Sequence, residues 1–294
     1  MIVVKDLTKV YANGKGIFDV SFEVKQGEVF GFLGPNGAGK TTTIRQLMGF
    51  TNATKGVCTI NGFDTRKDNG KIQKTLGYVP GEIAFFDALT GNEFIEFISN
   101  LRGFENKVKK QQLIDRFELD GSRKIRKMSK GMKQKVGLIT AFCHDPEVVL
   151  LDEPTSGLDP LMQRRFIELI QEEKKLGRTI LMSSHIFDEV DKTCERAAII
   201  KEGRIVALDR IDSLKSELRK SFVVTFKHAK DETLLKDSGL QFTQLDAYKY
   251  EIFIGEDYAP MLKTLSQCEV AHLDSPAQTL EQIFIRYYGK EVSQ

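Results

Sequence analysis

Gly34-Pro35-Asn36-Gly37-Ala38-Gly39-Lys40-Thr41 is the stretch that decides the fold. It fills every fixed position of the phosphate-binding pattern GxxxxGK[ST], directly after an apolar run at 29–33 and directly before a helical pattern. Glycines in such a loop let backbone N–H groups converge on phosphate oxygens, and the following helix directs its positive end at them. A ligand-free glycine-rich turn is the alternative, and the complete pattern in a strand-to-helix context argues against it. The stretch therefore predicts a P-loop.

Each part of this loop has an expected role at a nucleotide. Lys40 is expected to bridge the β- and γ-phosphates, and the hydroxyl of Thr41 is expected to ligate Mg²⁺. The residues predicted to hold the nucleotide here are Gly34, Pro35, Asn36, Gly37, Ala38, Gly39, Lys40, Thr41 and Thr42.

A second motif places two acids at the end of an apolar strand. Residues 148–151 are Val-Val-Leu-Leu, and Asp152 and Glu153 follow them. A buried strand of this kind delivers carboxylates to the carboxyl edge of a parallel sheet. Asp152 is predicted to hold Mg²⁺ through water, and Glu153 to orient or deprotonate an attacking water. Alone, such a pair usually marks only a strand end with a helix cap, whereas beside a P-loop it predicts a hydrolytic site.

The hydrophobic pattern predicts an α/β protein with a smaller second domain. Three short strands at 2–7, 17–24 and 28–33 indicate a β layer. Further strand-like runs alternate with helical segments, which indicates a parallel sheet. Between about 82 and 146 the apolar period is helical, so an inserted helical subdomain is expected. Residues 213–294 carry short strands and helices of their own and are predicted to form a C-terminal α+β domain.

Composition limits the possible functions. The 294 residues carry 43 basic and 41 acidic side chains, a formal net charge of +2, which is too small for a general nucleic-acid surface. The basic cluster at 123–127 has no interleaved aromatics, so it is attributed to solvated surface and no nucleic-acid partner is expected. The four cysteines show no CxxC spacing, and neither a zinc site nor a disulfide framework is expected. Without an export signal or a membrane-spanning apolar run, a cytoplasmic protein is expected.

Over residues 1–210, the motifs and their order resemble those of the ATP-binding cassette (ABC) subunits of membrane transporters. The resemblance implies ATP as the nucleotide and a RecA-like P-loop NTPase core with an N-terminal antiparallel β layer, over residues 1–212. It implies that Tyr11 stacks on adenine, that Asp159 belongs to a nucleotide-contacting D-loop (156–159), and that His185 contacts the γ-phosphate and senses hydrolysis. Taken singly, Tyr11 is as well explained as a core aromatic and His185 as a structural histidine near a strand end.

Two loops depart from the family pattern. At the place of the signature loop, usually LSGGQ, only Ser129 and Gly131 match. They keep the hydroxyl and the N–H groups at a helix N-terminus that can be aimed at phosphate, while Lys130 either adds charge there or faces solvent. After Pro80 the family carries a glutamine, and here Gly81 stands in its place. In the family, that glutamine contacts Mg²⁺ and relays to the permease. Here Glu82 or a water molecule would have to take this role, or the loop would couple through its backbone position alone.

The resemblance also implies partners. Two copies of the chain would bind ATP head to tail, with the P-loop of one copy facing the signature loop of the other. A separate polytopic membrane permease would hold the dimer at the cytoplasmic face of the membrane. Phe85, Phe86 and Phe94 are candidate permease contacts, with helical core packing as the alternative.

The expected function is that of the ATP-hydrolysing subunit of a transporter. The segment 280–288 is similar to the tail of cassettes from drug, peptide and antibiotic resistance exporters. Export of a drug, peptide or lipid-like substrate is therefore expected, and the C-terminal domain is expected to serve dimer contact or regulation. Two alternatives stay open: a soluble ABC ATPase acting on nucleic acid or ribosomes, and a nucleotide-gated regulatory module with low turnover.

Overall fold

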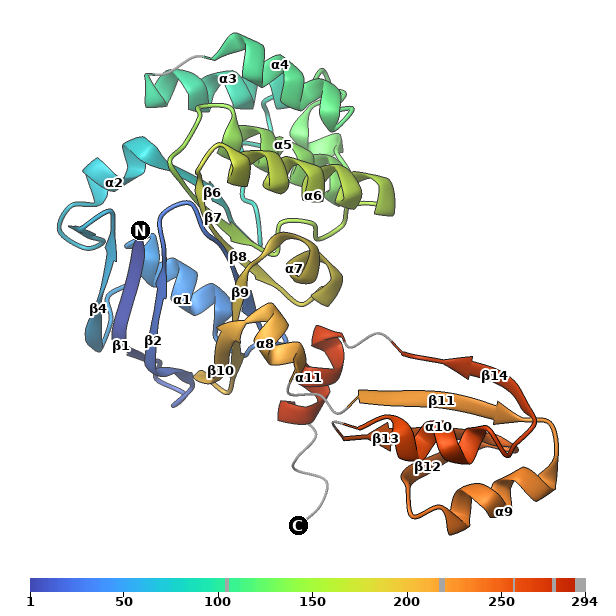
Figure 1. Ribbon diagram of the computed structural model, residues 1–294. Coiled ribbons are helices and arrows are strands. Elements are labelled where there is room, and N and C mark those ends of the chain that lie inside the picture. Colours follow the sequence, from blue (N-terminus) through green and yellow to red (C-terminus); the bar gives the residue numbers. More distant parts are fainter. Residues whose placement is uncertain (104–105, 217–219, 256, 277–278, 289–294) are drawn as a thin grey trace. The chain divides into compact units, whose positions relative to one another are not determined.

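The computed structural model of the chain describes residues 1–103, 106–216, 220–255, 257–276 and 279–288 (Figure 1). The chain divides into two units, Met1–Ile211 and Asp212–Gln294. The P-loop, the paired acids and His185, for which the resemblance implies the role of a switch histidine, all fall in the first unit. Among the described residues, none of the helices combines the length and apolar composition needed to cross a bilayer.

The first unit contains two sheets. Its strands are β1 Ile2–Val10, β2 Gly16–Val24, β3 Val29–Leu33, β4 Lys55–Ile60, β5 Phe63–Asp64, β6 Leu76–Val79, β7 Val148–Asp152, β8 Thr179–Ser184, β9 Arg196–Lys201 and β10 Arg204–Arg210. Four strands form an antiparallel sheet in the order β2-β1-β4-β5. Six form the order β10-β9-β3-β8-β7-β6, in which β10 pairs antiparallel with β9 and the other pairs are parallel. The α/β prediction is confirmed.

The helices of this unit follow from local signals. They are α1 Lys40–Leu47, α2 Asn69–Thr75, α3 Gly91–Arg102, α4 Lys107–Arg116, the short 3-10 helix η1 Ile125–Lys127, α5 Lys130–Phe142, α6 Pro160–Lys175 and α7 Phe187–Thr193; α8 Ile211–Ser216 starts at the last residue of this unit and belongs mostly to the second. Thr90 and Glu93 form a reciprocal capping box at the start of α3. Ser129 caps α5, and Asp159 caps α6 with Pro160 in its first turn. Each of these helices therefore begins where the sequence supplies a cap.

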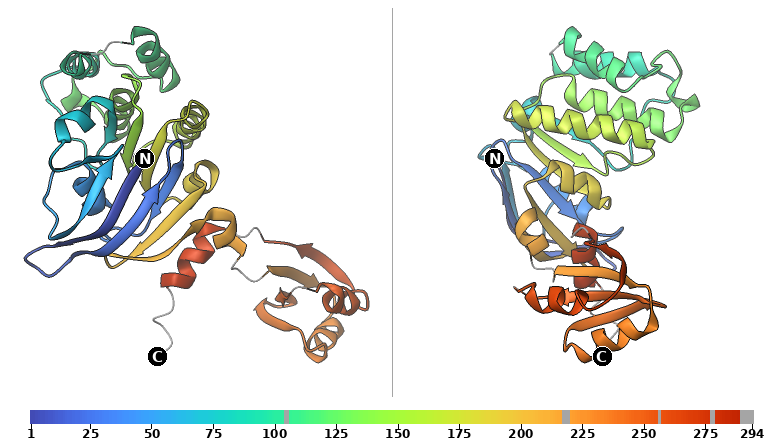
Figure 2. Two further views of the ribbon diagram at one scale, coloured as in Figure 1. Left: turned by 60° about the vertical axis from the view of Figure 1, so that its left-hand side comes forward. Right: turned by 45° about the vertical axis from the view of Figure 1, so that its right-hand side comes forward.

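The central strands are buried because both faces of the six-stranded sheet are covered. Every residue of β3, β7 and β8 is buried, as expected for parallel strands. On one face, side chains of β3 share a core with α1 and the antiparallel sheet, and Phe22 of β2 stacks on Phe30 of β3 at 5.4 Å between ring centroids. Figure 2 shows this antiparallel layer beside the larger sheet. On the other face, α7 approaches β3 so closely that a Cβ on Gly31 would lie 2.5 Å from Val190 Cγ1.

The expected helical block lies between β6 and β7. It consists of α3, α4, η1 and α5, and α5 packs against β6 (Figure 1). Of the three strands expected to form the opening β layer, the third lies in the other sheet. The strand at 29–33 pairs in parallel with β8 and β9 at the centre of the six-stranded sheet and not in the antiparallel layer. Strands β4 and β5 and helix α2 were not predicted from the sequence.

The second unit has a sheet and a core of its own. Its elements are β11 Lys220–Phe226, α9 Ala229–Asp237, β12 Gln241–Asp246, β13 Lys249–Ile254, α10 Ala259–Leu265, β14 Val270–Asp274 and α11 Leu280–Tyr288. The strand order β12-β13-β11-β14, all antiparallel, with this βαββαβ succession is that of the ferredoxin-like motif. The fully buried Tyr250 lies in its core with Val224 and Leu235. The α+β class expected for this segment is confirmed.

Candidate functional site

The P-loop lies at the carboxyl end of the central strand β3. Gly37 and Gly39 have φ angles of 83° and 116°, a conformation that glycine adopts without a Cβ penalty. A Cβ on Gly34 would lie 2.7 Å from the carbonyl oxygen of Ile200, so only glycine fits there. α1 begins directly afterwards, at Lys40, and its free N–H groups point back at the loop. The loop therefore has the backbone geometry of an anion-binding turn.

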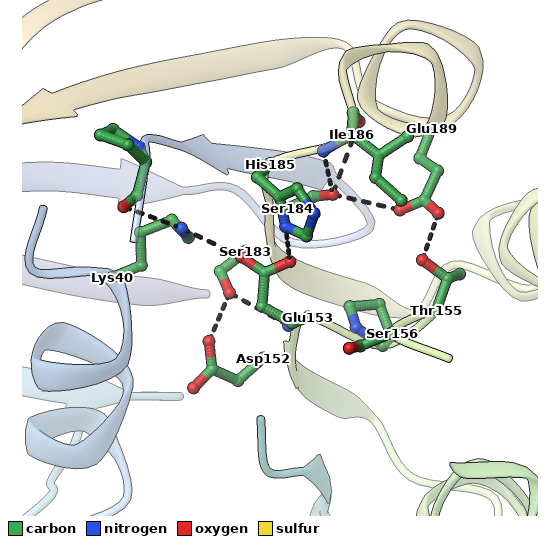
Figure 3. A network of polar contacts seen from close by, with 12 residues as sticks. Lys40, Asp152, Glu153, Thr155, Ser156, Ser183, Ser184, His185, Ile186 and Glu189 are labelled. Carbon is green, nitrogen blue, oxygen red and sulfur yellow. Dashed lines mark hydrogen bonds and ion pairs between the residues drawn. The ribbon is translucent and has the colours of Figure 1, made fainter. Parts of the chain in front are cut away.

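The ammonium of Lys40 makes three contacts that close the loop. Lys40 Nζ donates to the carbonyl oxygens of Gly34 and Pro35, at 2.6 and 3.2 Å. It also lies 3.0 Å from Glu153 Oε1, and the lysine side chain is 5% exposed. Residues 113 positions apart in the chain thus form a nearly buried ion pair, which brings the P-loop and the paired acids together (Figure 3).

Asp152 is fully buried at the end of β7, and one of its carboxylate oxygens is left for a ligand. Ser183 Oγ donates to Oδ1 at 2.5 Å. Oδ2 is buried and has no hydrogen-bond partner among the described residues, a costly arrangement unless a cation or water completes it. A cavity of about 260 Å³ opens here, lined by Thr41, Arg45, Tyr78, Pro80, Gly81, Glu82, Asp152 and Glu153. A hydroxyl and carboxylate oxygens at one cavity suit Mg²⁺, so Thr41 and Asp152 fit such an ion.

Glu153 has an unusual backbone and two charged neighbours. Its φ is 51°, which is rare for a residue with a Cβ. Its N–H donates to the carbonyl oxygen of Ser183 at 3.1 Å, which holds this conformation. Its Oε2 lies 2.5 Å from Nδ1 of His185, and the side chain of His185 is 51% exposed. Strained residues of this kind collect at functional sites, and this one joins Lys40 to His185.

A buried acid that the sequence did not point to lies close by. Glu189, in the first turn of α7, accepts hydrogen bonds from Thr155 Oγ1 and, at 3.1 Å, from Ser184 Oγ. Burial raises its pKa, while those two hydroxyls lower it. No local pattern singles it out, because an acid in the first turn of a helix is common and is usually explained by the helix dipole. Ser183 was also missed, because a serine at a strand end carries no distinctive pattern.

The signature loop contacts the D-loop of the same chain. Ser129 Oγ accepts from the N–H of Met132 at 3.2 Å, which caps α5. A Cβ on Gly131 would lie 2.6 Å from the carbonyl oxygen of Gly157. Lys130 Nζ donates to Ser156 Oγ at 2.7 Å, so Lys130 has a partner in this structure and is not simply a solvated lysine.

Three other expected site residues have these surroundings. Tyr11 is 38% exposed, with Lys9 Nζ 5.6 Å from its ring centroid, so it is not a core aromatic. Asp159 Oδ1 accepts from the N–H groups of Leu161 and Met162, both at 3.0 Å, as the cap of α6. A Cβ added to Gly81 would lie 3.1 Å from Asp152 Oδ2, and Gly81 lines the same cavity as Asp152. The backbone at Gly81 therefore touches the candidate metal site although the residue has no ligating side chain.

The comparisons with known proteins agree with this geometry. The family model described as "ABC transporter" matches residues 17–156. ABC transporter ATP-binding protein NatA of Bacillus subtilis (strain 168) is 38% identical over 206 residues, covering 68% of this chain and 84% of NatA. The uncharacterized ABC transporter ATP-binding protein all4389 of Nostoc sp. is 33% identical and covers 99% of this chain and 90% of that protein. Bacitracin transport ATP-binding protein BcrA of Bacillus licheniformis is 36% identical over 75% of this chain and 73% of BcrA.

Solved structures share the fold of the first unit. One described as the ATP binding subunit of an ABC transporter has a TM-score of 0.68 at 31% identity and covers 74% of this chain and 92% of its own. The dimeric cassette MJ0796, bound to ADP and Pi, has a TM-score of 0.65 at 23% identity and covers 72% of this chain and 99% of its own. The complete P-loop, the buried acids beside it and a relative matched over nearly the whole length lead to one conclusion. The chain belongs to the ABC transporter family, as an ATP-binding ATPase subunit.

Proposed function

We propose that this chain powers export through a separate membrane permease, and that it hydrolyses ATP as a head-to-tail dimer in the presence of Mg²⁺. The observation that carries the catalytic part is the contact of Glu153 with both Lys40, at 3.0 Å, and His185, at 2.5 Å. These are the groups that bind phosphate, position water and contact the γ-phosphate in the expected mechanism. Their convergence supports the assignment of Lys40, Glu153 and His185 as catalytic residues.

In this mechanism, binding of ATP changes the partner of Lys40. Its ammonium is held by two loop carbonyls and Glu153, and phosphate oxygens replace these acceptors. Glu153 then loses its cation and is free to accept a proton from the attacking water. His185, already in contact with the same carboxylate, orients it and reaches the γ-phosphate. Thr41 and Asp152 would hold Mg²⁺, which when bound offsets negative charge on the phosphates.

The dimer is proposed because one chain offers phosphate-binding groups at two separate places, the P-loop and the start of α5. The start of α5 offers Ser129 and the N–H groups after it, and the first turn of α5 has no acid and begins with Lys130. Such a helix N-terminus is attractive to a phosphate. In Figure 1, α5 belongs to the helical block, whereas α1 lies between the two sheets. We therefore assign Ser129 and Gly131 to the ATP bound by a second copy, and Tyr11 and Asp159 to nucleotide contacts of the assembled site.

Variants that break different halves of the site test the dimer. Lys40→Ala removes the phosphate ligand, and Ser129→Arg blocks the signature loop. Neither variant alone should hydrolyse ATP, but a mixture should recover activity, because a mixed dimer contains one intact site. If the two halves act within one chain, the mixture stays inactive and the head-to-tail arrangement is wrong.

The permease is proposed to dock at an aromatic cluster of Phe85, Phe86, Phe94 and Phe97. Phe86 and Phe97 are 57% and 43% exposed, and their ring centroids lie 5.6 Å apart. Phe94 is 9% exposed and packs edge-to-face on Phe85, at 4.8 Å between ring centroids, and in a tilted arrangement on Phe86, at 6.3 Å. Exposed aromatics gathered on one surface mark interaction sites. The partner would keep this chain at the cytoplasmic face of the membrane.

The export direction is supported by the similarity to BcrA, named for bacitracin transport, and to the linearmycin resistance ATP-binding protein LnrL of Bacillus subtilis (strain 168), which is 33% identical over 223 residues. Purification from detergent extracts tests the partner. The chain should be recovered with a polytopic membrane protein, whereas recovery with ribosomes or DNA would favour the soluble ATPase alternative.

Residues 213–294 are proposed as an accessory domain, which is supported by their separate core. If a fragment ending at residue 216 bound no ATP, that assignment would be wrong.

A further inference from the structure

Glu189 is a buried acid to which the hydrolysis mechanism gives no role. Only 2% of the residue is exposed. Its two carboxylate oxygens accept hydrogen bonds from two separate segments: Thr155 Oγ1 donates to Oε1, and Ser184 Oγ donates to Oε2 at 3.1 Å (Figure 3). Both donors are buried as well, with 2% and 1% exposed. The carboxyl group therefore forms a bridge between the segment after β7 and the last residue of β8.

The bridge is fixed at both ends. A buried carboxyl group needs hydrogen bonds in place of its hydration, and Thr155 and Ser184 supply one to each of its oxygens. Ser184 is further fixed, since its Oγ accepts from the N–H of Ile186 at 2.9 Å. The two loops are thus tied at a set distance by one side chain.

The bridge is one of three side-chain connections between residues 152–155, where β7 ends, and residues 183–185, where β8 ends. Asp152 is joined to Ser183, and Glu153 is joined to His185. The second of these connections is exposed on the histidine side, where water competes for the hydrogen bond. The connection through Glu189 is enclosed, because all three of its residues are buried. It is therefore suited to hold the other two in register.

We propose that Glu189 is a positioning residue for ATP hydrolysis: by tying Thr155 to Ser184, it fixes the loop that carries Glu153 relative to the loop that carries His185. The proposal rests on the ATPase activity of the chain and assigns to Glu189 no contact with the nucleotide. Without the bridge, the switch histidine and the catalytic carboxylate would still be present. They would, however, spend less time in the geometry that hydrolysis requires.

Steady-state ATPase kinetics of the full chain test this role. In Glu189→Ala, kcat should fall about 10- to 100-fold, the range found when residues that orient catalytic ligands are removed. KM for ATP and the affinity for a fluorescent ATP analogue should stay unchanged, because the P-loop contacts are intact. Glu189→Gln keeps the length, one acceptor for Thr155 and a donor toward Ser184 Oγ. It should restore most of kcat.

Glu173 provides a matched control. It is buried to the same 2% and is ion-paired with Lys109 at 2.9 Å, on α6 rather than in these loops. Glu173→Ala should lower the melting temperature but leave kcat unchanged. If Glu189→Ala does not fold, Thr155→Val and Ser184→Ala each remove one hydroxyl of the bridge, and each should lower kcat at constant KM.

Three results would overturn the proposal. The first is a wild-type kcat in folded Glu189→Ala, or in both single-hydroxyl variants. The second is a Glu189→Gln variant as slow as Glu189→Ala, which would assign the effect to charge. The third is an equal loss of kcat in Glu173→Ala, which would assign it to general destabilisation. A wild-type chain without ATPase activity would instead contradict the proposed function, so the two failures are distinguishable.

Discussion

The imidazole of His185 and the carboxylate of Glu153 are in hydrogen-bond contact, with 2.5 Å between Nδ1 and Oε2. The other oxygen of this carboxylate lies 3.0 Å from Lys40 Nζ. Glu153 therefore contacts the lysine of the P-loop and a histidine that follows a different strand. Substitutions of these three residues are therefore expected to affect ATP binding and ATP turnover to different extents.

Glu153→Gln should bind ATP and hydrolyse it very slowly. The amide keeps the shape of the side chain but cannot take a proton from water, and loss of a general base costs about 10²- to 10⁴-fold in rate. Phosphate release measures turnover, and gel filtration with ATP should show accumulated ATP-bound dimer. Glu202→Gln is the matched control, since Glu202 shares a left-handed backbone, φ 49°, but is exposed in the β9–β10 turn. Undiminished phosphate release in Glu153→Gln would exclude Glu153 from catalysis.

Lys40→Met should abolish the stabilisation of the protein by ATP. A ligand at 100 times its Kd stabilises the native state by about 2.7 kcal/mol, which raises the melting temperature. Methionine keeps the apolar stem in its nearly buried position and removes the ammonium that phosphate requires. Lys67→Met, at an exposed lysine, should keep the full ATP-dependent shift in a thermal melt. A normal shift in Lys40→Met would contradict the phosphate-binding role.

Stability should fall in acid because of His144. Burial, followed by the Arg102 guanidinium, lowers the pKa of His144 to about 4 from an ordinary 6.5. Between these values the unfolded imidazole binds a proton and the native one does not, so the unfolded state is favoured as pH falls. The linked loss approaches about 3 kcal/mol from pH 7 to below pH 4.

Urea denaturation at pH 7 and pH 4.5 measures this effect. His144→Gln should lose less stability between the two pH values than the wild type. The same substitution at the exposed His272 serves as the control and should leave the pH dependence as in the wild type. If His144→Gln loses as much stability as the wild type between pH 7 and pH 4.5, other groups cause the loss.

Two phenylalanines of the aromatic cluster should respond differently to the same substitution. Phe94→Ala removes a buried ring and should cost about 3–5 kcal/mol in unfolding free energy. Phe86 is 57% exposed, and Phe86→Ala should change stability by less than about 0.5 kcal/mol. The docking proposal adds that Phe86→Ala loses the permease in pull-down experiments while keeping its ATPase activity. Full recovery of the permease with Phe86→Ala would place the docking surface elsewhere.

Motifs whose residues are adjacent in the chain could be predicted from the sequence. The P-loop is one continuous stretch, so its glycines, Lys40 and the start of α1 follow from spacing alone. The cap at Ser129 and the acids after β7 are local in the same way. Segment 55–75 was not recognised, because its elements are short, and its strands are defined by pairing: β4 pairs with β1, and β5 pairs with β4.

Contacts between distant segments were decided only by the tertiary structure. Nothing in the pattern around Thr155 indicates that its hydroxyl meets Glu189, since the two residues are 34 positions apart and each is compatible with an ordinary turn or helix. The place of β3 between β8 and β9 likewise depends on parallel pairing, for which a single strand carries no local code. By itself, the sequence determined the phosphate-binding loop and the chemical groups of the site, because these depend on residues adjacent in the chain. The tertiary structure decided which of those groups touch, because burial of both sheet faces brings the ends of separate strands to one edge and leaves Lys40, Glu153 and His185 in contact there.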